Sequence, residues 1–151
     1  SRIVPRPCVT LCTGTCSGVS KKRALSARVF GASAFTRVRE ANEEVGVIPQ
    51  TVRLLGQGDT YLSGSGYAIA PFVGVLPPDF VPRPHAGEVA DVFETPLSFL
   101  MDAANHERHE REFRGALRAY YAMPHNGRYI WGVTAGMLKS FYDRLYGSID
   151  T

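Results

Sequence analysis

The sequence predicts an α/β domain that starts near residue 36 and occupies the rest of the chain. Three observations support this prediction. Residues 39–47 place carboxylates at helical spacing, short apolar runs that favour strands follow from residue 51 onward, and residues 135–146 repeat apolar side chains every three or four positions. A chain of 151 residues has room for one hydrophobic core rather than two domains.

The first predicted helix carries the chemistry of the chain. Glu40, Glu43 and Glu44 are neighbours on one helix face, because residues three and four positions apart lie side by side. Like charges repel at this spacing unless a cation lies among them. Mg²⁺ is such a cation, and it is often held by one or two carboxylates together with substrate phosphates. Arg39 stands four positions before Glu43 and can orient that carboxylate.

The middle of the chain reads as strands and loops. Residues 51–55 predict a short strand, residues 66–76 a longer apolar strand, and residues 89–94 a further extended segment. Residues 77–84 contain four prolines, which remove backbone donors, so they predict a loop.

A short helix is expected to begin near Pro96 and to pass into a charged run at residues 105–112, which predicts a solvated helix face or a mobile loop. His106 and His109 within this run lack the spacing of a helical zinc motif, so they are not expected to bind metal.

The last third of the chain predicts a hairpin followed by a helix. Residues 118–125 and 128–131 flank Asn126 and Gly127, the favoured residues of a two-residue turn with positive φ. Thr134 can then cap a helix over residues 135–146, whose apolar side chains are expected in the core: Met137, Leu138, Phe141, Tyr142 and Leu145. Trp131 could equally be a packing residue, because large aromatic side chains contribute strongly to hydrophobic cores.

Charge divides the chain unevenly. Residues 1–39 contain eight basic and no acidic residues, a net charge of +8, whereas residues 40–151 contain nine basic and fourteen acidic residues, a net charge of −5. The overall +3 is therefore an average of two unlike segments and does not indicate a uniformly basic surface. We accordingly expect no nucleic-acid partner for the globular part. No apolar run reaches the roughly 20 residues that span a bilayer, so no membrane segment is expected.

Residues 1–35 form an atypical basic segment, for which three interpretations are open. It has the composition of a targeting sequence, it could be a basic arm for a polyanion, or it could be an upstream region translated out of register. The third interpretation is favoured, because the composition changes abruptly. Disorder of this segment is compatible with all three interpretations. Cys8, Cys12 and Cys16 lie here, in a stretch that favours extended or irregular structure. They lack a fourth soft ligand for zinc, and their odd number fits a reducing cytoplasm better than a disulfide framework.

Residues 39–47 match the second half of the Nudix signature, G-x5-E-x7-R-E-U-x-E-E-x-G-U, in which U is an apolar residue. Ala41 and Val47 occupy the apolar positions and Gly46 the glycine. The first half is not recognisable, because Leu25 and Gly31 stand where the signature has its glycine and glutamate. Residues 74–80, 88–97 and 129–136 resemble downstream blocks of the coenzyme A pyrophosphatase branch of that family. The resemblance covers roughly residues 38–147.

The resemblance implies an α/β/α sandwich with a mixed sheet over residues 36–151, and hydrolysis of a pyrophosphate linkage that depends on Mg²⁺ or Mn²⁺. It implies that Glu43 and Glu44 are metal ligands, that Glu40 is a metal ligand or the general base, and that Glu88 is a further carboxylate from a loop. The substrate implied is coenzyme A or a derivative, which is a small nucleotide-like molecule. The protein would act in the cytoplasm, and it could form a homodimer.

The degenerate loop before the helix predicts reduced or absent activity, because a glycine needed at positive φ is not freely replaced by leucine. Two alternatives are a catalytically inactive Nudix-like module that binds nucleotide or protein, and a polyanion-binding protein that uses the basic N-terminal segment.

Overall fold

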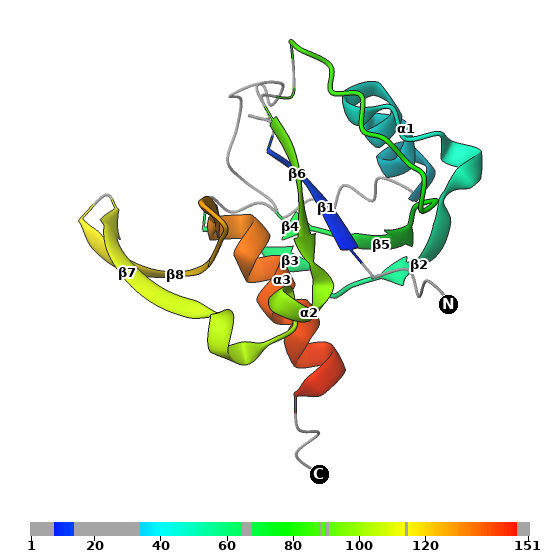
Figure 1. Cartoon of the computed structure of the whole chain (residues 1–151). Coiled ribbons are helices and arrows are strands. Elements are labelled where there is room, and N and C mark those ends of the chain that lie inside the picture. Colours follow the sequence, from blue (N-terminus) through cyan, green and yellow to red (C-terminus); the bar gives the residue numbers. More distant parts are fainter. Residues whose placement is uncertain are drawn as a thin grey trace.

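The computed structural model describes residues 8–13, 34–64, 68–87, 89, 91–113 and 115–147. The α/β class is confirmed, since these residues form both helices and strands (Figure 1). In chain order the elements are β1 (Cys8–Thr13), α1 (Ala34–Val45), the 3₁₀ turn Pro49–Thr51, β2 (Arg53–Gln57), β3 (Tyr61–Leu62), β4 (Ala68–Ile69), β5 (Phe72–Val75), β6 (Asp91–Pro96), α2 (Leu97–Leu100), the 3₁₀ turn Ala103–Asn105, β7 (Glu107–Phe113), β8 (Ala116–His125), β9 (Arg128–Trp131) and α3 (Gly132–Tyr146).

The strands form small sheets. β1 pairs with β6, β2 with β5, and β3 with β4, while β7, β8 and β9 form a three-stranded sheet in that order. Each of these pairings is antiparallel. The extended structure expected around the first two cysteines is confirmed for the backbone of Cys8–Thr13, and Cys16 lies outside the described residues.

The predicted β-hairpin is confirmed. β8 and β9 meet at a two-residue turn in which Asn126 has φ 46° and Gly127 has φ 75°. His125 pairs directly with Arg128 across this turn. Both central residues thus adopt the left-handed conformation that asparagine and glycine tolerate best.

The prediction of a helix face or loop for residues 105–112 is wrong. Most of this charged run is β7, which pairs with β8 along its whole length from Glu107↔Ala122 to Phe113↔Ala116. A strand needs a partner for its backbone hydrogen bonds, and β8 supplies it, so pairing between distant residues overrides the local charge pattern.

The other predicted strands are present, but they begin and end at different residues from those predicted. The strand expected at residues 51–55 begins only at Arg53, after the turn Pro49–Thr51. The long strand expected at residues 66–76 is broken by Pro71 into β4 and β5, which pair with different partners, because proline has no N–H for a ladder. The segment expected at residues 89–94 becomes β6, and the proline-rich loop before it is confirmed.

The two C-terminal helices differ from expectation at their ends. α2 begins after Pro96 as predicted but is only four residues long. α3 begins at Gly132, with Trp131 extended as its N-cap, so Thr134 lies inside the helix and does not cap it. Of the predicted core side chains, Leu138 packs against buried residues, whereas Leu145 is 52% exposed.

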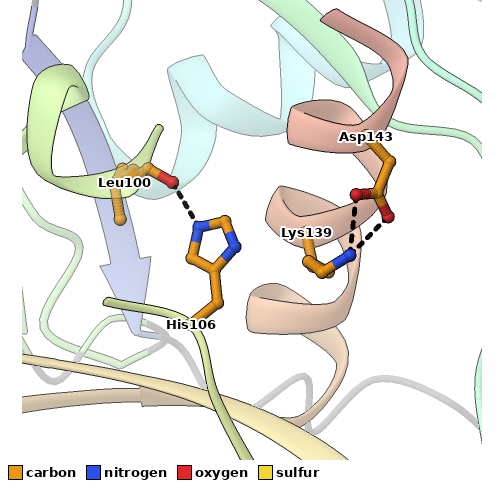
Figure 2. Close-up of polar contacts among 4 residues, drawn as sticks. All are labelled: Leu100, His106, Lys139 and Asp143. Carbon is orange, nitrogen blue, oxygen red and sulfur yellow. Dashed lines mark hydrogen bonds and ion pairs between the residues drawn. The ribbon is translucent and has the colours of Figure 1, made fainter. Parts of the chain in front are cut away.

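The main hydrophobic cluster joins α2, the hairpin and α3. Leu100, Met123, Ile130 and Ala135 are buried together. His106 lies half-buried beside this cluster, where its Nε2–H donates to the Leu100 carbonyl at 2.7 Å (Figure 2). Its Nδ1 is buried and finds no hydrogen-bond partner in the described part of the chain. A carbonyl only accepts, so Nε2 carries the hydrogen in this contact.

Gly136 marks the place where β3 meets α3. An added Cβ at Gly136 would lie within 3 Å of three atoms of the Tyr61 side chain, the hydroxyl oxygen and two ring carbons. The helix can therefore approach this tyrosine only with a glycine at that position.

Candidate functional site

The glutamate helix α1 has an apolar face and an acidic face. Val38, Ala41 and Val45 pack into a second hydrophobic cluster with the buried residues Val47 and Val89. Glu40 and Glu44 lie one turn apart and are both half-buried, whereas Glu43 is exposed. Neither Glu40 nor Glu44 is without an interaction partner. Packing of the apolar face thus fixes the side on which the carboxylates emerge.

The end of α1 is closed by Gly46, which has φ 75°. Its N–H donates to the Asn42 carbonyl at 3.0 Å, and the N–H of Val47 donates to the Ala41 carbonyl at 3.3 Å. The side-chain amide of Asn42 donates to the Val47 carbonyl at 2.8 Å. A left-handed glycine of this kind ends many helices by satisfying their last carbonyls.

The loop between β5 and β6 binds the same helix end. The N–H of Arg83 donates to the Val45 carbonyl at 2.9 Å, and the N–H of His85 donates to the Glu44 carbonyl at 2.8 Å. The N–H of Val89 in turn donates to the His85 carbonyl at 2.9 Å. Figure 1 shows this loop running beside α1. The last turn of the glutamate helix and the loop therefore form one hydrogen-bonded unit.

The predicted pairing of Arg39 with Glu43 is present as a loose contact. Arg39 Nη1 lies 4.0 Å from Glu43 Oε1, and the two side chains are 60% and 59% exposed. An exposed i,i+4 pair of this length stabilises a helix only by about 0.3–0.5 kcal/mol.

Within the ranges that the structure describes, no three histidine, cysteine, aspartate or glutamate side chains gather closely enough to hold a metal ion. A Mg²⁺ site does not need three, since one or two carboxylates and substrate phosphates suffice. Glu40 and Glu44 are half-buried residues, and carboxylate oxygens are hard donors, which suit Mg²⁺ or Mn²⁺. The donor chemistry of α1 therefore fits such an ion.

Glu88, the candidate loop carboxylate, lies outside the described residues, as do Leu25 and Gly31. The residue after Glu88 lies within the described part of the chain. Val89 is only 4% exposed and packs with Val45 and Val47. Val89 thus packs against the end of α1.

The two histidines of the charged run lie apart from these carboxylates. His109 Nε2 lies 2.8 Å from Glu107 Oε2 on β7, and His106 serves the packing described above. The sequence interpretation placed both histidines in a solvated charged run. His106 is instead half-buried, and its ring meets the ring of Tyr142 edge-on at 5.0 Å.

The sequence interpretation missed the surface that β7, β8 and β9 form together. Tyr129 and Trp131 are about half exposed on it, at 51% and 52%. Trp131 is therefore not a buried packing residue. The sequence did contain a signal for this surface. Residues two apart on a strand share a face, so the strands on either side of Asn126 and Gly127 could have been sorted into two faces, with Tyr129 and Trp131 on the same one.

Comparison with known proteins identifies relatives of the chain. No protein-family model matches it. It is 36% identical over 103 residues to the "Uncharacterized Nudix hydrolase NudL" of Photorhabdus laumondii, a match that covers 68% of this chain and 55% of the relative. Proteins of the same name from Escherichia coli (strain SMS-3-5 / SECEC) and Enterobacter sp. (strain 638) are 33% and 32% identical over 102 residues, 68% of this chain and 53% of each relative.

The chain thus spans about half the length of the curated relatives that it matches. A search of the described helices finds none that is long and apolar enough to cross a membrane.

Proposed function

Because the chain belongs to the Nudix hydrolase family, we propose that α1 supplies carboxylates for the hydrolysis of a pyrophosphate linkage with the help of Mg²⁺ or Mn²⁺. The proposed substrate is a small molecule built on a nucleoside diphosphate, with coenzyme A or a derivative as the first candidate. The observation that supports this most directly is the arrangement of α1, whose apolar face is buried while Glu40 and Glu44 emerge one turn apart.

The proposed roles follow from the positions of the side chains. Glu44 and Glu43 would hold the ion, and Arg39 would keep Glu43 in place. Glu40 would be a further ligand or the general base, and Glu88 a further carboxylate from the loop. A bound divalent ion supplies positive charge that neutralises the phosphate oxygens and orients the reacting groups.

The proposed reaction needs one water molecule. Its oxygen attacks one phosphorus of the P–O–P linkage, the bond from that phosphorus to the bridging oxygen breaks, and two phosphate monoesters result. As general base, Glu40 would take the proton from the attacking water, an effect that typically contributes about 10²–10⁴-fold to rate. With coenzyme A the products would be a phosphopantetheine and an adenosine bisphosphate.

Two measurements on the full chain test this proposal. Calorimetric titration with Mn²⁺ should give a binding isotherm that weakens at least about tenfold in Glu44→Gln, because a ligand charge is lost while the shape is kept. Glu112→Gln, an exposed change on β7, is the matched control and should leave binding unchanged. Equal Mn²⁺ affinities in wild type, Glu43→Gln and Glu44→Gln would contradict the assignment.

Product formation from coenzyme A, followed by chromatography with Mg²⁺ and then Mn²⁺, tests the reaction itself. We expect turnover below that of a full-length relative, since Leu25 and Gly31 replace the glycine and glutamate of the signature. Glu40→Gln should abolish the remaining turnover. Turnover at the level of the relative would refute the predicted impairment, and turnover that survives Glu40→Gln would refute the role of that residue.

A binding module without catalysis is the second candidate. It is favoured by the degenerate first half of the signature, where Leu25 and Gly31 stand at the glycine and glutamate positions. Calorimetry that detects coenzyme A binding with no product after prolonged incubation would support it over the hydrolase. A polyanion-binding role would rest on the basic N-terminal residues, and deletion of residues 1–35 should then abolish a binding that weakens steeply with salt.

A further inference from the structure

One face of the three-stranded sheet gathers arginine and aromatic side chains. Directly paired residues of antiparallel strands share a face, so β7 and β8 place Arg111 beside Arg118 and His109 beside Tyr120. β9 adds two more residues on the same side, at Ala122↔Trp131 and Pro124↔Tyr129. We name this surface the arginine–aromatic face; its members are His109, Arg111, Arg118, Tyr120, Tyr129 and Trp131.

The two arginines of this face form an unusual pair. Arg111 and Arg118 are both exposed and stand directly opposite each other, an arrangement in which like charges destabilise a sheet. Within the described chain no carboxylate pairs with Arg111. Arg118 Nη1 donates to the Gly64 carbonyl at 2.6 Å, which occupies one of the five N–H donors of its guanidinium. The pair thus retains donors and charge for an anion.

The acidic residues of β7 do not neutralise this pair. Glu110 lies on the other face of the strand, where its Oε1 is 3.1 Å from Arg108 Nη1. Glu107 lies on the same side of the sheet, but its Oε2 is 2.8 Å from His109 Nε2. Glu107 is also four residues away from Arg111 along the strand. The end of the face that carries the arginines is therefore positively charged, and an anion there would relieve repulsion.

The aromatic members form a continuous patch beside the arginines. The rings of His109 and Tyr120 stack at 5.5 Å with an angle of 28°. Tyr120 meets Trp131 edge-on at 5.8 Å, and Trp131 lies 6.5 Å from Tyr129. Trp131 and Tyr129 remain about half exposed, which leaves ring surface for stacking by a ligand.

We propose that the arginine–aromatic face binds a purine nucleoside phosphate, with the phosphate between Arg111 and Arg118 and the base against the rings of Tyr120 and Trp131. Arginine forms paired N–H···O contacts with phosphate, and every base has a flat face that stacks on aromatic rings. Tyr120 lies two residues beyond Arg118, about 7 Å along the strand, which is comparable to the reach from phosphate to base.

This face is a second site, distinct from the glutamate helix. Figure 1 shows α1 on one side of the molecule and the β7–β8 hairpin on the other. The inference therefore goes beyond the proposed hydrolysis and does not depend on it. Glu44→Gln, which should impair the metal site, is expected to leave this binding unchanged.

Trp131 provides the measurement, because it is the only tryptophan of the chain. Titration of the full chain with adenosine monophosphate should quench its fluorescence to saturation. Adenosine, which lacks the phosphate, should bind at least about tenfold more weakly, and inorganic phosphate should compete. Rising salt should weaken the binding of the monophosphate but not that of adenosine.

Arginine variants supply the decisive comparison. Arg111→Gln should weaken adenosine monophosphate about tenfold, since one charge-assisted contact is lost. Arg118→Gln should do the same. Arg108→Gln is the matched control, because this arginine lies on the same strand and points to the other face. If Arg118→Gln fails to fold because the contact to Gly64 is lost, Arg111→Gln still decides the outcome.

Three outcomes would overturn the inference. The first is equal affinity of Arg111→Gln and Arg108→Gln for adenosine monophosphate. The second is tryptophan quenching that depends on protein concentration without nucleotide, together with a dimeric mass by light scattering, which would assign the face to a second copy. The third is binding of a single-stranded oligonucleotide with no measurable binding of the mononucleotide, which would assign it to a nucleic-acid strand.

Discussion

Gly46 offers a sharp test of how α1 and its neighbouring loop are built. Replacement by alanine should cost free energy for two reasons. First, an L-residue held at φ 75° is strained by roughly 1–2 kcal/mol relative to glycine. Second, the added Cβ would lie 3.2 Å from Arg83 Cβ, so the loop that donates to the last carbonyls of the helix must shift.

The structure provides matched controls for each contribution. Gly115 has the same φ of 75° with no described atom within 4 Å of an added Cβ, so Gly115→Ala isolates the backbone strain. Gly56 has no neighbour within 4 Å and no positive φ, so Gly56→Ala should be near neutral. We expect losses of unfolding free energy in the order Gly46→Ala, Gly115→Ala, Gly56→Ala, with about 2, about 1 and about 0 kcal/mol.

Urea unfolding followed by circular dichroism measures this series. At a typical slope of roughly 2 kcal/mol per molar, Gly46→Ala should lower the midpoint by about 1 M. Calorimetric titration with Mn²⁺ then shows whether the shifted loop also disturbs the carboxylates. Equal midpoints for Gly46→Ala and Gly56→Ala would refute the reasoning, because neither the strain nor the contact with Arg83 would exist.

Three further changes test the rest of the molecule. Leu100→Ala should lower the unfolding free energy by about 3 kcal/mol, because Leu100 is completely buried in the main cluster; a loss below about 1 kcal/mol in urea unfolding would contradict that packing. Gly136→Ala should destabilise by about 1–2 kcal/mol although alanine favours helices, because the methyl group would collide with Tyr61; in a Tyr61→Leu background the same change should become neutral or stabilising, and an unchanged cost would argue against the contact. The pKa of Tyr129 is raised above its usual value. The largest cause is the side-chain hydrogen bond with Tyr120, and desolvation and charge repulsion by Tyr120 and Glu107 contribute less. Tyr120→Phe should therefore lower the pKa of Tyr129 in an ultraviolet titration of the phenolate, and no change would exclude the contact. In wild type the associated stability is complete below the unfolded pKa of about 10 and is lost as pH rises through the higher folded value.

Short-range rules predicted the parts of the fold that depend on neighbouring residues. Asn126 and Gly127 specify their turn because few other residue pairs accept positive φ at both positions. Pro96 marks the start of α2 for reasons equally local. The arrangement of Glu40, Glu43 and Glu44 on one helix could likewise be predicted from spacing.

Long-range pairing explains what the sequence did not predict. The charged run of β7 is a strand because β8 lies beside it, and that partner begins only at Ala116, beyond a turn that no charge pattern specifies. Pro71 divides one apolar run between two sheets, which becomes evident only when the partners are known. The arginine–aromatic face was missed for the same reason, since Arg111 and Arg118 come together only through the register of β7 and β8.

The hydrogen bonds from the β5–β6 loop to the end of α1 have a consequence for exchange with solvent. The amide hydrogens of Arg83 and His85 belong to a loop, and a loop usually exchanges them quickly. Here they can exchange only when the carbonyls of Val45 and Glu44 release them. Their exchange rates should therefore follow the opening of the last helical turn, so that two loop amides report how often the backbone of the glutamate helix frays.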